Sequence, residues 1–178
     1  ANQDGLARTC AVLASQYPEF WTLLWQSSPH RRLWQESISV AIVLHSREYI
    51  DLPERISWVR QYPHPRLKCI IPVHASETKI RAQIVRQFKK DIEGGLLSVL
   101  VCECAVDSDQ ALLQLLADAD TDWVVMSTND LWSDVSSLQL QLRRLAEQPA
   151  MQIVEGIPKL WRRDLLFDIE YLAEFKAD

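Results

Sequence analysis

Short runs rich in β-branched residues alternate with amphipathic segments along most of the chain, and this alternation limits the possible folds more than any other feature. Such runs with short connections are typical of crossover units, which place parallel strands in one sheet and helices on both of its faces. We therefore expect an α/β fold with a parallel or mixed central sheet. Strands are predicted at 38–44, 67–73, 96–105, 122–126 and 151–154, with helices over 49–60, 76–92, 107–116 and 131–147.

By analogy with doubly wound sheets, the first four strands should lie side by side in the order third, second, first, fourth. The third run is apolar almost throughout, which is typical of a strand covered on both faces. The segment 161–175 is predicted to be mostly helix, and residues 1–36 to form an N-terminal helical extension before an α/β domain over 37–178. Five side chains should be buried in strands or on the long helix: Val43, Ile71, Val99, Val125 and Leu142.

Charge and hydropathy narrow the possible partners. The net charge is −5, from 19 basic and 24 acidic residues that are mixed along the chain, so no basic face for nucleic acid is expected. No apolar run approaches the roughly 20 residues that a membrane span requires. The first residues lack the basic-then-apolar order of a secretory signal. The sequence therefore predicts a cytoplasmic protein without a membrane span.

Cysteine and glycine usage argues against several kinds of site. The four cysteines, Cys10, Cys69, Cys102 and Cys104, form no CxxC pair, so we expect reduced thiols and no zinc. The chain has only four glycines, and neither GxGxxG nor GxxxxGK[ST] occurs. Phosphate-cradling loops use glycine to bring the backbone close to the ligand, so P-loop and dinucleotide-binding functions lose their main support.

Ligands of parallel α/β sheets bind beyond the carboxyl ends of the strands. The first two predicted strands end at His45-Ser46 and at His74-Ala75-Ser76. The third ends at Val106-Asp107-Ser108-Asp109, and the fourth at Ser127-Thr128-Asn129-Asp130. These residues are the candidate site if the strands are parallel. Both histidines could instead be ordinary loop residues.

The hydroxyl and carboxylate groups at the strand ends have a second interpretation, because each strand-to-helix connection also needs a helix cap. Asp107 or Ser108 could cap the helix after the third strand. Ser76 or Thr78 could cap the helix after the second strand, and Asn129 or Asp130 could cap the helix after the fourth.

Residues 38–175 resemble the family 2 glycosyltransferases, which have the type A nucleotide-sugar transferase fold. The best stretch is Thr121 to Gly156, TDWVVMSTNDLWSDVSSLQLQLRRLAEQPAMQIVEG, and Leu160 to Leu166 is similar to the family's aromatic-Arg-Arg-acid-Leu-Leu segment. ISVAIVLHS and LKCIIPVHASETK match its first two strands in position and apolarity. The resemblance implies a nucleotide-sugar donor. The donor's base would lie over the first two strand ends, near His45, Ser46, His74 and Ser76, and its diphosphate near Asn129 and Asp130.

The sequence departs from this family at the residues that carry its chemistry. The family's Asp-x-Asp metal motif is replaced by Ser127 to Asp130, which leaves Asp130 as the sole candidate ligand for Mg²⁺ or Mn²⁺, with weak binding expected. The family's base-reading acid falls near His74 or Ala75. Its catalytic base would either lie beyond Asp178, in which case the domain is truncated, or be absent, and no catalytic residue is assigned. Arg47, Lys79 and Arg162, which we expect near the strand tips, are the cations that could stabilise a leaving diphosphate instead.

Two functions follow from this pattern. The first is a glycosyltransferase with a degenerate metal motif that uses a nucleotide-sugar donor. The alternative is a non-catalytic binding or architectural module within a polysaccharide-assembly protein, with a protein partner or a second copy of the chain as its ligand.

Overall fold

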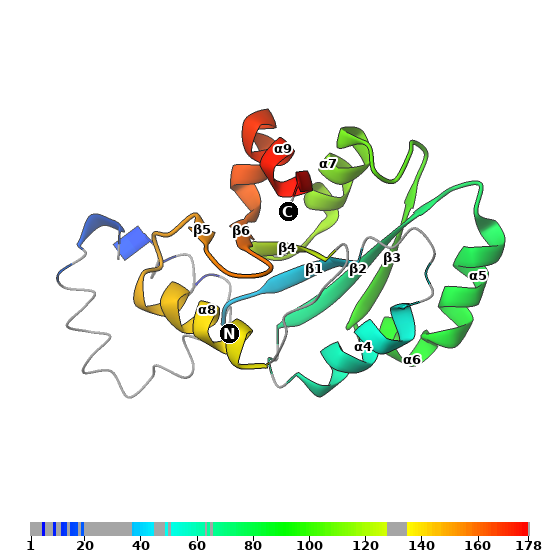
Figure 1. The fold of residues 1–178 in the computed structure, drawn as a ribbon, viewed down its shortest axis with the longest axis horizontal. Helices are drawn as coiled ribbons and strands as arrows, with labels where there is room; N and C mark the ends of the chain where they lie inside the picture. The colour runs from blue at the N-terminus through cyan, green and yellow to red at the C-terminus, as the bar shows by residue number, and fades with distance from the viewer. Residues whose placement is uncertain are drawn as a thin grey trace.

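A six-stranded mixed sheet forms the centre of the computed structural model, with helices packed on both faces (Figure 1). The structure describes residues 5, 9, 12–13, 15–17, 19, 37–44, 49, 51–62, 64, 66–127 and 135–177. Within these residues, no helix has the length and apolar character needed to cross a membrane. The division into an extension over 1–36 and a domain over 37–178 stays a prediction.

The strand order is β3-β2-β1-β4-β6-β5. Strands β1 (Val40–Leu44), β2 (Leu67–His74), β3 (Leu97–Cys102) and β4 (Trp123–Ser127) are parallel, which confirms both the predicted order and the α/β class. Two short antiparallel strands, β5 (Ile153–Val154) and β6 (Leu160–Arg162), continue the sheet beyond β4. The sheet is therefore mixed.

Two hydrophobic cores lie on opposite faces of the sheet because successive strand side chains point to opposite sides. In β1, Val40, Ile42 and Leu44 belong to one core, whereas Ala41 and Val43 belong to the other. The first core is closed by α4 (Leu52–Gln61), α5 (Thr78–Gln87), α6 (Lys89–Glu93) and α8 (Val135–Glu147). The second is closed by α7 (Asp109–Asp118), the 3₁₀ helix η1 (Arg163–Phe167) and α9 (Ile169–Ala177) (Figure 1).

Four of the five side chains predicted to be buried are at most 2% exposed, namely Val43, Ile71, Val125 and Leu142. The prediction for Val99 is wrong, because this side chain is only partly buried. Val99 lies in β3, which has β2 as its single neighbour at the edge of the sheet. The expectation that both faces of this strand are covered fails for the same reason.

The prediction that 161–175 is mostly helix is wrong at its start. Trp161 lies in β6 and pairs with Val124, and Arg162 pairs with Trp123. The segment thus provides hydrogen-bond partners for the edge of β4 that faces away from β1, which would otherwise leave backbone groups without partners. The helical prediction holds from Arg163 onward, first in the 3₁₀ helix η1 and then in α9 (Ile169–Ala177).

Candidate functional site

The carboxyl ends of the parallel strands are staggered. Strands β1 and β4 end side by side, with Leu44 paired to Ser127. The pairing of β1 with β2 runs to Val43 and Ile70, whereas the pairing of β2 with β3 continues to His74 and Cys102. The tip of β2 therefore projects beyond the ends of β1 and β4, and polar groups on this tip face the edge where ligands of such sheets bind.

A tight turn over residues 74–77 forms this tip. The Glu77 amide donates to the His74 carbonyl at 2.9 Å, and the Ala75 amide donates to the Cys102 carbonyl at 2.8 Å. The His74 ring is bound back onto the turn: the Ser76 amide donates to Nδ1 at 3.2 Å, and the Ser76 hydroxyl oxygen lies 2.7 Å from Nδ1. The structure thus brings two of the predicted site residues, His74 and Ser76, into direct contact.

The prediction that Ser76 or Thr78 caps the following helix is wrong. The N-cap position of α5 is Glu77, and no side chain accepts a hydrogen bond there. The Ser76 hydroxyl is bound to the His74 ring instead, because the turn places the two side chains together. Ser76 therefore acts on the orientation of His74 rather than on the stability of α5.

Sequence reasoning missed two residues next to this turn, Tyr49 and Glu77. The Tyr49 hydroxyl donates to the Pro72 carbonyl at 3.2 Å, and the Glu77 carboxylate acts on its pKa. Burial, and then the negative charge of Glu77, raise the pKa of Tyr49 to about 12, so the phenol stays protonated at neutral pH. The Tyr49 backbone has a φ of 54°, a left-handed conformation that is uncommon for a residue other than glycine.

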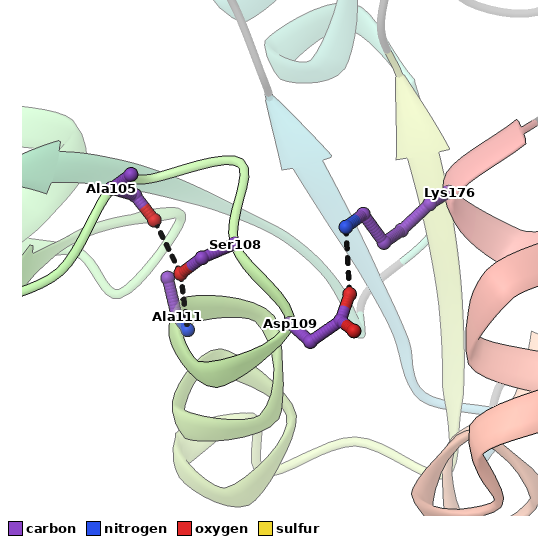
Figure 2. Close-up of polar contacts among 5 residues, drawn as sticks. All are labelled: Ala105, Ser108, Asp109, Ala111 and Lys176. Atoms are coloured by element: carbon purple, nitrogen blue, oxygen red, sulfur yellow. Dashed lines mark hydrogen bonds and ion pairs between the residues drawn. The ribbon is translucent and has the colours of Figure 1, made fainter.

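The loop that follows the third strand holds α7 and α9 in place (Figure 2). Ser108 is the N-cap of α7: its hydroxyl accepts from the Ala111 amide at 3.2 Å and donates to the Ala105 carbonyl at 2.6 Å. The Lys176 ammonium of α9 lies 2.7 Å from the Asp109 carboxylate. Of the two candidate caps, Ser108 is the one that caps, and this loop joins α7 to α9.

Four of the predicted donor-binding residues, His45, Ser46, Asn129 and Asp130, lie outside the described residues, as does Arg47. The proposed metal ligand Asp130 is one of them. Lys79 is exposed in the first turn of α5, next to the β2 tip. Among the described residues, no group of three or more histidine, cysteine, aspartate or glutamate side chains could hold a metal ion. The described part of the chain therefore offers no complete metal site.

The expectation that Arg162 lies near the strand tips is wrong. Arg162 pairs with Trp123, the first residue of β4, and so lies at the amino edge of the sheet, where its guanidinium is 3.2 Å from the Asp164 carboxylate. The direction of β6 causes the difference, because an antiparallel strand carries its last residue to the opposite edge. The neighbouring Arg163 donates to the Leu116 and Ala119 carbonyls at the end of α7, which is a structural role.

A cavity of about 660 Å³ lies at this amino edge, far from the β2 tip along the strands. Its lining includes Val12 of the N-terminal segment together with Ile38, Trp123, Arg162 and Asp164. The last two are paired with each other. We place the candidate site at the carboxyl edge instead, because the predicted polar residues that the structure describes, His74 and Ser76, converge there.

The three described cysteines, Cys69, Cys102 and Cys104, carry free thiols. Cys69 and Cys102 are buried, and burial raises the pKa of the Cys69 thiol to about 12. A protonated, buried thiol is a poor nucleophile, so Cys69 belongs to the core rather than to the candidate site.

The fold is that of a glycosyltransferase-like α/β domain. The sequence matches no protein-family model and no curated protein. Among solved structures, it is similar to the mannosyltransferase PcManGT from Pyrobaculum calidifontis in complex with GDP-Man and Mn²⁺, with 16% identity and a TM-score of 0.52. The likeness covers 96% of this chain and 56% of that chain, so the present chain spans little more than half the length of its neighbour.

Proposed function

We propose that the chain is a nucleotide-sugar-binding domain of the glycosyltransferase class, related to family 2, and that the donor binds at the carboxyl edge of the sheet. The observation that carries this proposal is the likeness of the fold to a mannosyltransferase in complex with GDP-Man. The polar turn at the β2 tip supports it, because His74 and Ser76 lie at the sheet edge where ligands of such folds bind.

In this proposal, the nucleobase lies over the ends of β1 and β2, near His45, Ser46, His74 and Ser76. The diphosphate lies beyond β4, near Asn129 and Asp130. Lys79, exposed at the start of α5, is the described cation closest in sequence to this edge, and helix N-termini favour bound anions. The cytoplasmic location expected from the sequence stays a prediction.

We expect Mn²⁺ to improve nucleoside diphosphate binding by less than about tenfold, or about 1.4 kcal/mol. A divalent cation needs anionic ligands beside the diphosphate, and the fourth strand end supplies the single carboxylate of Asp130, with the neutral Asn129 before it. Isothermal titration calorimetry of UDP, GDP, CDP and ADP, each with and without Mn²⁺, measures the difference.

The matched variants are Asp130→Ala and Asp107→Ala, the second of which removes an exposed acid at the third strand end. We expect both to leave the Mn²⁺ effect small. Tight binding that collapses on removal of Mn²⁺ or in Asp130→Ala, but not in Asp107→Ala, would show a working metal site and overturn the prediction.

One observation favours the alternative function, a non-catalytic binding or architectural module: the fourth strand end lacks the paired acids of the family's metal motif. A turnover assay separates the two functions. A transferase should release nucleoside diphosphate from its nucleotide sugar at a rate above that of buffer, whereas a binding module should bind the nucleotide and leave the sugar attached. A protein partner or a second copy of the chain would be the ligand of a purely architectural module.

A further inference from the structure

Strand β3 has the sequence of an interior strand but lies at the edge of the sheet (Figure 1). Residues 96–102, LLSVLVC, contain no charged residue and no proline. Proteins often protect an edge strand with a charge or a proline, because its unpaired backbone groups attract further strands. A continuous apolar run is typical instead of a strand that is covered on both faces. The sequence of β3 therefore fits a strand with a second neighbour.

The backbone of β3 bonds to β2 through every second residue. The Ala75 amide at the end of β2 donates to the Cys102 carbonyl at 2.8 Å, and the register places the even-numbered residues of β3 toward β2 in the same way. Within the described chain, no strand pairs with the other side of β3. The backbone N–H and C=O groups that face this free side belong to Leu97, Val99 and Val101.

The side chains of β3 are incompletely covered on both faces of the sheet. Val99 packs against the first core and Leu100 against the second, and both stay partly exposed, as does Val101. By contrast, every residue of the interior strand β1 is buried. A further strand beside β3 would cover these apolar side chains and would also pair the outward backbone groups.

We propose that β3 pairs antiparallel with β3 of a second copy of the chain, so that the two sheets form one continuous sheet across a twofold axis. Twofold dimers are the commonest oligomers, and each copy provides the same apolar strand. With the axis at Leu100, Val99 of one copy lies opposite Val101 of the other, and both have outward N–H and C=O groups. Glu103 then lies opposite Leu97, so no like charges face each other.

This contact does not depend on nucleotide binding. It uses the outer side of β3, whereas the proposed nucleotide site lies at the ends of β1, β2 and β4. The dimer and the proposed function can therefore fail separately.

Analytical ultracentrifugation of the whole chain tests the inference. One pair of short strands buries a small interface, so we expect a monomer–dimer equilibrium with a Kd on the order of 100 μM. Because β3 contains no charged residue, NaCl at about 0.5 M should not weaken the dimer. A monomer up to about 1 mM would overturn the inference in favour of a strand from a different protein. A larger open-ended assembly, or a dimer that dissociates in salt, would also overturn it.

Val99→Pro tests the backbone contact. The substitution removes an outward N–H and leaves the bonds to β2 intact, and proline is tolerated at such edge positions. The twofold axis doubles the loss to two hydrogen bonds, so the Kd should rise at least about thirtyfold. Val99→Ala is the matched control, because it shortens the same side chain but keeps the N–H, and its Kd should stay within about fivefold of the wild type. Circular dichroism checks that both variants fold. A Val99→Pro variant that dimerises like the wild type would contradict the inference.

Amide hydrogen exchange of the wild-type chain, followed by NMR, does not depend on any variant folding. The amides of Val99 and Val101 should exchange more slowly as the protein concentration rises, in step with the fraction of dimer. The amides of Leu100 and Cys102, which are bonded to β2, should stay protected at every concentration. Exchange at Val99 and Val101 that does not change with concentration would overturn the inference.

Discussion

Val125→Asp is expected to destabilise the domain by about 4 kcal/mol or more, enough to unfold much of a protein with ordinary stability. Val125 is fully buried in β4 and pairs with Ile42 of β1 in the middle of the sheet. An aspartate there must either bury a charge with no partner or take up a proton, and both cost free energy. Urea unfolding followed by circular dichroism measures the loss.

Val85→Asp is the matched control, because Val85 undergoes the same chemical change at a site on α5 that is 44% exposed. We expect its effect to stay within about 0.5 kcal/mol, apart from the small difference in helix propensity. If the Val125 variant unfolded like the wild type, the position of β4 in this structure would be wrong.

Trp161→Ala should cost about 3–5 kcal/mol of unfolding free energy, because it empties a large site in the second core. The Trp161 side chain is 1% exposed in β6, and its ring meets the Phe175 ring edge-on, with 6.0 Å between the centroids. This contact joins β6 to α9. Loss of the Trp161 ring should therefore also lower the helical circular dichroism signal of the folded state.

Phe167→Ala provides the comparison, since Phe167 is 51% exposed at the end of η1. Its cost should be within about 0.5 kcal/mol. Equal effects of the two substitutions would mean that the Trp161 side chain does not pack against α9. They would favour the predicted helix over 161–175 instead of β6.

Local sequence was enough to predict the four parallel strands, because each is a continuous apolar run between turn residues. The sequence could not show which run lies at an edge, so Val99 of β3 was expected to be buried. It also could not show β6, because Leu160–Arg162 is a strand of three residues whose formation depends on the free edge of β4. Edge position and strand direction are properties of the assembled sheet.

In the candidate site, too, some features could be predicted from local sequence and others depend on the assembled sheet. His74 and Ser76 follow a recognisable strand, so their place at the carboxyl edge could be predicted. The roles of Tyr49 and Glu77 depend on a contact across the edge between the chain after β1 and the start of α5, for which the sequence holds no signal. Arg162 was expected at the tips because nothing in its sequence context reveals that β6 runs antiparallel.

The most direct test of the central claim, that a nucleotide binds at the carboxyl edge, is a titration of the ¹⁵N-labelled chain with CDP, UDP, ADP and GDP, followed through its backbone amide chemical shifts. The account predicts that the largest changes among the described residues occur at His74, Ser76 and Glu77. Changes centred on Arg162 and Asp164 at the opposite edge, or no change with any of the four nucleotides, would contradict it.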